Sequence, residues 1–187
     1  RNLRIAHRIA APPVLDGKLD DWKGMTQIAL QNPKVNPEDA SGFGYLAWDD
    51  TALYIAIEIR DNELLNTRPR SKLYQQDSLE LFISTEPRDT DAGYGPHDHQ
   101  FFVTPTSAEG KPVFGKVTDR EAGVVADVTD AKFIAGKGGP GWIAEIVIPW
   151  ATLPGFSPAE AATMALEMRV NDADAAHERF KVDPIDG

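Results

Sequence analysis

The chain carries the stretch LYIAIEIR at residues 53–60, in which large apolar side chains occupy every second position. Successive side chains of an extended strand point to opposite faces, so one face would hold four of them: Leu53, Ile55, Ile57 and Ile59. The other face carries mostly polar or aromatic residues. This period of two predicts a β-strand with one buried face rather than an amphipathic helix.

The same alternation recurs in four further segments, at residues 79–83, 101–103, 142–148 and 164–170. Clusters rich in Gly, Pro, Asp and Asn separate the segments, as is typical of hairpins and open loops. Helical signals are limited to short turns near residues 20–24 and 149–153. Strands without intervening amphipathic helices favour an all-β fold, an antiparallel β-sandwich of the immunoglobulin-like or jelly-roll-like kind.

Length and composition are those of a folded globular protein, with 187 residues, 42% of them hydrophobic and 26% charged. We expect residues 1–187 to form a single domain, because β-sandwiches of this size commonly share one core. A formal net charge of −10, without a cluster of Lys and Arg, argues against nucleic acid as a partner. No apolar stretch approaches the roughly 20 residues of a membrane-spanning helix, so no membrane insertion is expected.

Common catalytic motifs are absent from the sequence, including the Ser nucleophile elbow, the phosphate-binding Gly loop and the zinc-protease helix. The chain has no cysteine, which removes a Cys nucleophile and thiolate metal sites. A glycosidase-like pair of carboxylates could be drawn from three residues on polar strand faces: Glu80, Glu145 and Glu167. Solvated surface positions explain these residues more simply. We therefore expect no catalytic residues, and a catalytic domain, if one exists, would lie outside this chain.

The side chains of the sequence suggest two kinds of metal site, one for a transition metal and one for calcium. His97 and His99 would share one face of a strand while Asp98 points away, which is a weak signal for a transition metal. Acidic loops offer the oxygen ligands that calcium prefers, at Asp61, Asn62, Asp89, Asp91, Asp98, Asp172 and Asp174. Acidic loops are often only solvated, so structural calcium stays an open expectation and no other cofactor is expected.

Aromatic residues beside polar loops favour sugar binding, because sugar rings present apolar C–H faces that stack on Tyr and Trp. Tyr74 lies in such a loop, followed by two glutamines and an aspartate. Three tryptophans with apolar neighbours are instead expected in the core: Trp22, Trp142 and Trp150. Trp48 precedes an Asp-Asp turn and could serve either role.

Five segments in a fixed order resemble family 9 carbohydrate-binding modules, a β-sandwich family related to DOMON domains. They are VLDGKLDDW at 14–22, LAWDDTALY at 46–54, QDSLELFI at 76–83, GWIAEIVIPW at 141–150 and RVNDAD at 169–174. The likeness runs from Val14 to about Arg179. It implies a module that holds the end of a glucan or xylan chain between two aromatic rings, with structural calcium nearby.

By position, the resemblance implies that the first stacking ring falls on Tyr74 and the sugar-bonding glutamate on Glu80. The arginine of the family falls on Phe102, which cannot donate a hydrogen bond, although Gln100 points to the same face. An amide residue of the family falls on Arg169 and a downstream arginine falls on Arg179, so the resemblance implies guanidinium groups on neighbouring strands. The sugar-binding residues are therefore predicted to be Tyr74, Glu80, Gln100, Arg169 and Arg179.

The resemblance assigns no residue of this chain to the second stacking ring of the family, and residues 181–187 contain no aromatic side chain. The resemblance further implies a secreted, periplasmic or cell-surface protein linked to a glycoside hydrolase domain.

Two other functions remain open. A domain of this fold could act in structure or interaction without binding sugar. Related β-sandwiches also bind b-type haem through Met with His or Lys, for which Met164 and Met168 are candidates. Both methionines lie on the apolar face of a strand, where core packing explains them more simply.

Overall fold

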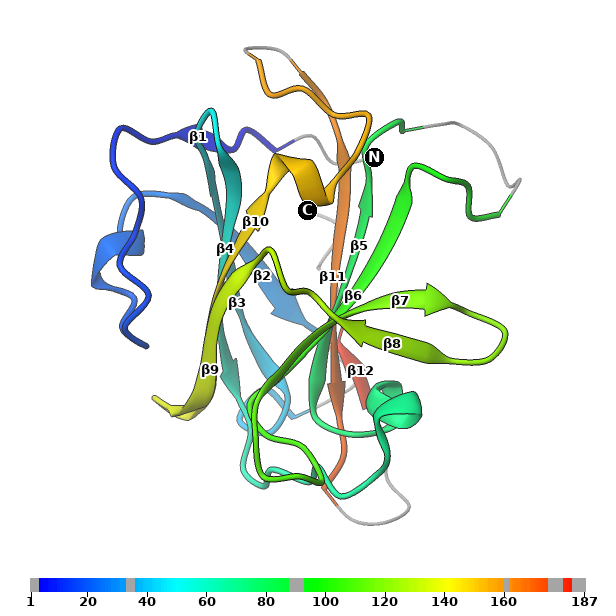
Figure 1. The fold of residues 1–187 in the computed structure, drawn as a ribbon. Coiled ribbons are helices and arrows are strands. Elements are labelled where there is room, and N and C mark those ends of the chain that lie inside the picture. Colours follow the sequence, from blue (N-terminus) through cyan, green and yellow to red (C-terminus); the bar gives the residue numbers. More distant parts are fainter. Residues whose placement is uncertain (1–3, 33–35, 88–92, 160–161, 175–179, 183–187) are drawn as a thin grey trace.

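A computed structural model describes residues 4–32, 36–87, 93–159, 162–174 and 180–182, and Figure 1 shows two β-sheets facing each other. The first sheet contains β1 (His7–Arg8), β2 (Thr26–Gln31), β3 (Ser41–Trp48), β4 (Ala52–Arg60), β9 (Lys132–Gly138) and β10 (Gly141–Pro149). The second contains β5 (Ser78–Ser84), β6 (Asp98–Thr104), β7 (Val113–Asp119), β8 (Val124–Asp127), β11 (Ala165–Asp172) and β12 (Phe180–Val182). The predicted all-β sandwich is confirmed.

The strands of the first sheet follow the order β1-β3-β4-β10-β9, and β2 also pairs with β3. Those of the second follow the order β12-β11-β5-β6-β7-β8. Every described pair is antiparallel except β1 with β3. Three short 3₁₀ turns complete the fold: η1 (Asp20–Trp22), η2 (Arg70–Gln75) and η3 (Trp150–Thr152). The first and third are the predicted turns, and no helix of the described residues is long and apolar enough to cross a membrane.

The main core lies between the two sheets. The alternating apolar residues of β4 meet Leu79, Leu81 and Ile83 of β5, all fully or almost fully buried. Trp142 is in this core as predicted, and Trp150 is half-buried at its edge. Met168 is also buried in it and Met164 packs against it, so both methionines have a packing role.

The outer face of β4 is buried as well, contrary to the prediction of one buried face. Tyr54 and Ala56 pack there in a second cluster with Trp22, which comes from the N-terminal segment. The segment covers this face because Trp22 presents a large apolar surface that burial removes from water. Two layers of side chains therefore flank the first sheet.

Glu145 anchors this N-terminal segment, so the prediction of a solvated strand-face carboxylate is wrong at this position. The side chain is 0% exposed. One carboxylate oxygen accepts a hydrogen bond from the indole N–H of Trp22 (3.0 Å), and the other accepts the backbone N–H groups of Asp16 (3.1 Å) and Gly17 (2.6 Å). Three donors balance the cost of burying this charge.

Candidate functional site

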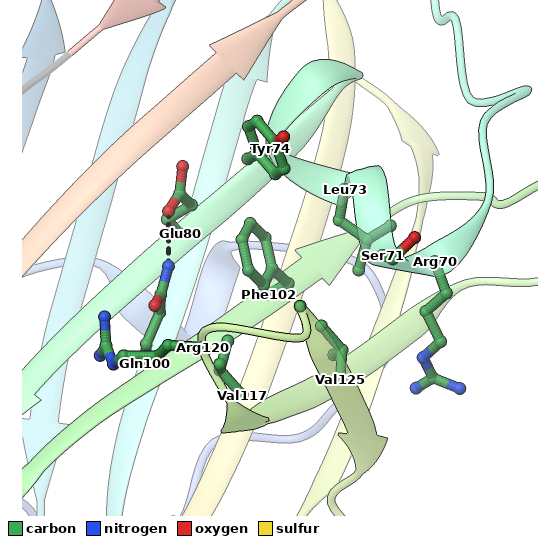
Figure 2. Close-up of a pocket in the computed structure, with 11 residues that line it drawn as sticks. Arg70, Ser71, Leu73, Tyr74, Glu80, Gln100, Phe102, Val117, Arg120 and Val125 are labelled. Atoms are coloured by element: carbon green, nitrogen blue, oxygen red, sulfur yellow. Dashed lines mark hydrogen bonds between the residues drawn. The ribbon is translucent and has the colours of Figure 1, made fainter.

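A hollow of about 260 Å³ opens on the outer face of the second sheet, the face turned away from the core (Figure 2). Its walls come from η2, from β5 and β6, and from the β7–β8 hairpin. The lining residues are Arg70, Ser71, Leu73, Tyr74, Glu80, Gln100, Phe102, Val117, Arg120, Gly123 and Val125. Three of the five sugar-binding residues predicted from the sequence thus line one hollow.

The floor of the hollow is apolar. Phe102 lies directly opposite Glu80 across the β5–β6 pair and packs with Leu73 and Val113 in a small cluster of its own. Val117 and Val125 of the β7–β8 hairpin pack against the same cluster. Phe102 therefore replaces a possible hydrogen-bond donor with an apolar surface, which suits the C–H face of a sugar ring.

Glu80 is the polar centre of the hollow. The side chain is only 3% exposed, so the solvated surface position expected from the sequence is wrong for Glu80 as well. Each carboxylate oxygen accepts one amide hydrogen bond. Gln100 donates to one oxygen (2.8 Å) and Asn171 donates to the other (2.9 Å). Because an ionised carboxylate offers about four lone-pair sites, each oxygen can accept a further donor.

Asn171 is a member of this site that the sequence reasoning missed. Its amide also donates to the hydroxyl of Ser78 (3.0 Å), which lies directly opposite on β5. The available signal was its position two residues after Arg169 on the same strand, which puts both side chains on one face. The sequence reasoning assigned only the arginine to the site.

Tyr74 forms the upper wall of the hollow in Figure 2, and its ring is 39% exposed. The hydroxyl accepts a hydrogen bond from the Gln75 amide (2.9 Å) and one from the Lys72 ammonium (3.3 Å). The Lys72 nitrogen also lies 5.6 Å from the ring centroid. These contacts fix the ring, a precondition for stacking at low entropic cost.

Arg169 lies beside the hollow without lining it. It is opposite Glu80 across the β11–β5 pair, but its guanidinium bonds Glu167 (2.7 Å) and lies over the ring of Phe82, 5.3 Å from the centroid. Glu167 is thus part of an ion pair on this face. Arg179, the fifth predicted sugar-binding residue, falls outside the described residues.

Two further residues at the hollow escaped the sequence reasoning, Arg120 and Tyr94. Arg120 extends from the turn between β7 and β8 and lines the hollow. Its guanidinium carbon lies 3.1 Å from the ring centroid of Tyr94, which precedes β6. The sequence GYGP at residues 93–96 indicated only a turn. No periodic pattern links two residues that far apart in the chain.

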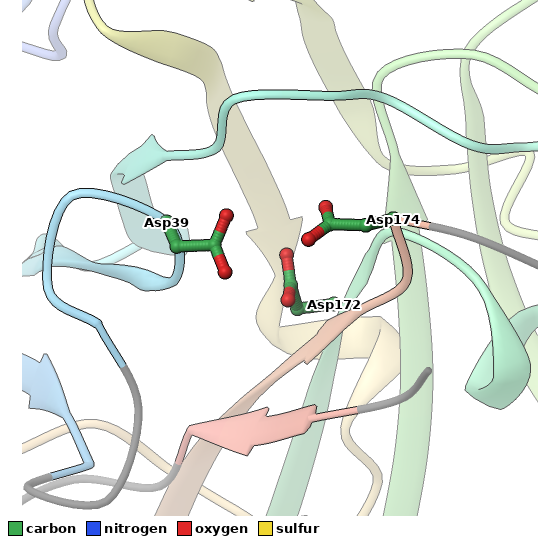
Figure 3. A group of neighbouring side chains, drawn as sticks. All are labelled: Asp39, Asp172 and Asp174. Carbon is green, nitrogen blue, oxygen red and sulfur yellow. The ribbon is translucent and has the colours of Figure 1, made fainter. Parts of the chain in front are cut away.

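A separate cluster of carboxylates lies at one end of the sandwich (Figure 3). Asp39, Asp172 and Asp174 form one group, and Asp61, Asp77 and Asp172 form another, each with one oxygen per residue within 4.8 Å of the others. The sequence offered Asp61, Asp172 and Asp174 among the candidate oxygen ligands for calcium, but not Asp39 or Asp77. The cluster joins the sheets, since Asp61 follows β4 and Asp77 precedes β5.

The cluster is electrostatically unsatisfied. Burial raises the pKa of Asp77 and of Asp172 to about 8 and that of Asp61 to about 7, and neighbouring carboxylates add to each shift. Asp77 accepts the backbone N–H groups of Ala173 (2.8 Å) and Leu65. One oxygen of Asp172, a residue only 2% exposed, has no hydrogen-bond partner. An all-oxygen set of buried carboxylates fits a hard cation such as Ca²⁺.

The other predicted metal ligands lie elsewhere. Asn62 donates to Asp39 at the rim of the cluster, and Asp98 accepts the backbone N–H of Gly95 (2.6 Å) next to β6. Asp89 and Asp91 fall outside the described residues. His99 is buried and desolvation lowers its pKa to about 4. Within the described ranges, neither His97 nor His99 belongs to a group of three potential metal ligands.

Comparison with known proteins gives consistent matches. A family model described as "Carbohydrate family 9 binding domain-like" matches residues 15–183. Endo-1,4-beta-xylanase A of Thermoanaerobacterium saccharolyticum is 26% identical over 175 residues, and Exoglucanase XynX of Acetivibrio thermocellus is 26% identical over 172 residues. The matches cover 93% and 91% of this chain but only 14% of each relative, so the chain spans a small part of their length.

Solved structures show the same likeness. A family 9 carbohydrate binding module from Caldicellulosiruptor kristjanssonii in complex with glucose has a TM-score of 0.68 and 25% identity, covering 95% of this chain and 84% of that one. The same module in complex with cellotriose has a TM-score of 0.68 and 24% identity, covering 95% and 83%. The likeness thus extends over nearly the whole described sandwich.

Proposed function

The chain belongs to the carbohydrate family 9 binding domain-like family, and on this premise we propose that the hollow around Glu80 binds the end of a β-linked glucan or xylan chain. The observation that carries this proposal is the fixed carboxylate of Glu80, held by two amides beside the exposed ring of Tyr74. A carboxylate accepts hydrogen bonds from sugar hydroxyls, while the ring and the floor of Phe102 contact the C–H face.

We propose that the site binds without catalysis. Glycoside hydrolysis generally needs two carboxyl groups on either side of the scissile bond, about 5–9.5 Å apart. Glu80 is the one carboxylate among the described residues that line the hollow. Glu145 lies beneath Trp22 on the outer face of the other sheet, and Glu167 pairs with Arg169. The family, too, is one of binding domains.

The second part of the proposal is a structural Ca²⁺ ion in the carboxylate cluster. Asp172 would be its central ligand, since this residue belongs to both groups and holds the unpartnered oxygen. A cation there would neutralise carboxylates from loops of both sheets. It would fix the end of β11, the strand that supplies Asn171 to the sugar site.

We further propose that the chain is one module of a larger, secreted glycan-degrading enzyme, or a partner of one. Its xylanase and exoglucanase relatives are far longer than the matched region. In such an arrangement the module would keep a catalytic domain near polysaccharide chain ends, which raises the local concentration of substrate.

Tyr74→Ala is expected to weaken binding of cellotriose and xylotriose by about tenfold, because the stacking of the ring and the area that it buries are together worth roughly 1.4 kcal/mol. Calorimetric titration of the purified chain measures the change. Tyr74→Phe is the matched control: it keeps the ring but loses the hydroxyl that Gln75 and Lys72 hold, so it should lose less affinity than Tyr74→Ala. Equal affinity for Tyr74→Ala and the unmodified chain would remove Tyr74 from the site.

A further inference from the structure

A second exposed ring lies near the sugar hollow. Among the aromatic residues that the structure describes, Tyr74 and Tyr94 are the most exposed, at 39% and 55%. Both lie on the outer face of the second sheet, Tyr74 in η2 and Tyr94 in the loop before β6. Since Arg120 lines the hollow and covers Tyr94, this ring and its guanidinium form a second wall.

Stacking holds this wall in place. The ring centroid of Tyr94 lies 6.3 Å from that of Phe82, and the guanidinium of Arg169 covers Phe82 from the neighbouring strand. Rings and guanidinium groups thus form a continuous row along the sheet. A guanidinium stacked on a ring keeps its N–H donors in the plane of the group, where a ligand can reach them.

Arg120 differs from the other arginines of this face in its charge balance. Arg70 pairs with Asp127, and Arg169 pairs with Glu167. Arg120 forms no ion pair with any residue in the described part of the chain. In a protein with a net charge of −10, Arg120 therefore brings to the hollow a positive charge that no ion pair among the described residues neutralises.

We propose that Arg120, held flat on Tyr94, binds the carboxylate of an acidic sugar unit, so that the chain prefers oligosaccharides that carry a uronic acid. The planar fork of a guanidinium matches a carboxylate through two parallel hydrogen bonds. Figure 2 places Arg120 beside Gln100, away from Tyr74, so that neutral sugar hydroxyls can meet Glu80 while the acidic group meets Arg120. This inference rests on the proposed sugar site.

The test compares neutral xylotriose with xylotriose that carries a single glucuronic acid branch. The branched ligand is tested as separate isomers, each with the branch on a different xylose. Calorimetric titration in 50 mM NaCl should give about tenfold tighter binding for at least one branched isomer, since charge-assisted bidentate hydrogen bonds are among the strong ones. In roughly 500 mM NaCl the advantage should shrink, because salt screens exposed charges, while xylotriose affinity stays nearly constant.

Variants test whether Arg120 and Tyr94 cause the preference for the acidic ligand. Arg120→Gln and Tyr94→Ala should reduce the preference to about twofold or less, and Tyr94→Phe should retain it because the ring remains. Lys137→Gln on β9 of the first sheet removes the same charge at a distance and is the matched control. Circular dichroism melts confirm that each variant is folded.

The possible outcomes distinguish the preference for acidic sugars from sugar binding itself. Equal affinity of the unmodified chain for all ligands, or a preference that survives Arg120→Gln, overturns the acidic-sugar inference and leaves sugar binding intact. Failure of the unmodified chain to bind any of these ligands overturns both. A preference that is lost in Arg120→Gln and kept in Lys137→Gln supports the inference.

Discussion

Glu80→Ala is expected to lower the affinity for cellotriose and xylotriose by about 100-fold or more. The substitution removes the carboxylate at the centre of the hollow and leaves the amides of Gln100 and Asn171 without their acceptor. Loss of two hydrogen bonds between sugar hydroxyls and a charged acceptor costs roughly 3 kcal/mol, which corresponds to about two orders of magnitude in Kd. Calorimetric titration measures the loss directly.

Two controls accompany this variant. Glu167→Ala removes a carboxylate from the same face that does not line the hollow, and it should bind neutral sugars normally. Glu80→Gln keeps the shape but replaces one acceptor oxygen by a donor, so an intermediate loss is expected. If Glu80→Ala bound both sugars as tightly as the unmodified chain, the sugar site would have to lie elsewhere.

Calcium is expected to raise the thermal midpoint of the chain by about 10 °C at pH 8. A ligand at 1,000 times its Kd stabilises the folded state by about 4 kcal/mol, and each kcal/mol is worth about 2–4 °C in a domain of this size. Differential scanning calorimetry in EDTA and in excess CaCl₂ measures the difference. No difference at pH 8 would contradict the proposed calcium site.

The pH dependence of this effect follows from the raised pKa values of the cluster. The pKa of Asp77 and Asp172 is about 8 in the folded chain and near 3.8 in the unfolded chain, so the folded chain binds more protons between these values. Without metal, the contribution of these groups to stability is fully present below about pH 4 and is lost as the pH rises towards 8. Calcium competes with those protons, so its stabilising effect should be larger at pH 8 than at pH 5.5.

Asp172→Asn tests the cluster itself, because Asp172 is shared by both groups of carboxylates. This variant should lose most of the calcium-dependent shift and gain stability in EDTA at pH 8, where it carries one buried negative charge fewer. Glu121→Gln, an exposed residue in the turn between β7 and β8, is the matched control and should keep the full shift. Mg²⁺ should replace Ca²⁺ poorly, because it demands a tighter octahedral shell.

The sequence predicts those parts of the fold in which apolar residues alternate. Strands outside the five predicted segments were missed, including β2, β7, β9 and the long β3. In β3, Gly42 and Gly44 stand where apolar side chains would mark the buried face. A Cβ at Gly44 would lie 2.5 Å from the sulfur of Met168, and one at Gly42 would collide with the backbone of β4. The space at both glycines is occupied by atoms of other strands, which a local sequence period cannot reveal.

Some residues of the proposed sugar site could likewise be predicted from the sequence, and others could not. Tyr74 and Glu80 could be assigned because a family resemblance places them, and Gln100 because the strand period orients it to the same face as Phe102. Arg120 and Tyr94 come together only when the β7–β8 hairpin folds over β6. Glu145 was misread because its partners lie about 130 residues earlier in the chain.

Glu145 also determines how far the chain can be shortened at its N-terminal side and where another protein can be joined to it. The first strand of more than two residues begins at Thr26, so a boundary drawn from the strands alone could remove everything before it. Such a truncation would strip the buried carboxylate of all three donors and uncover the apolar face beneath Trp22. A fusion junction therefore belongs on the N-terminal side of Asp16, well ahead of the long strands.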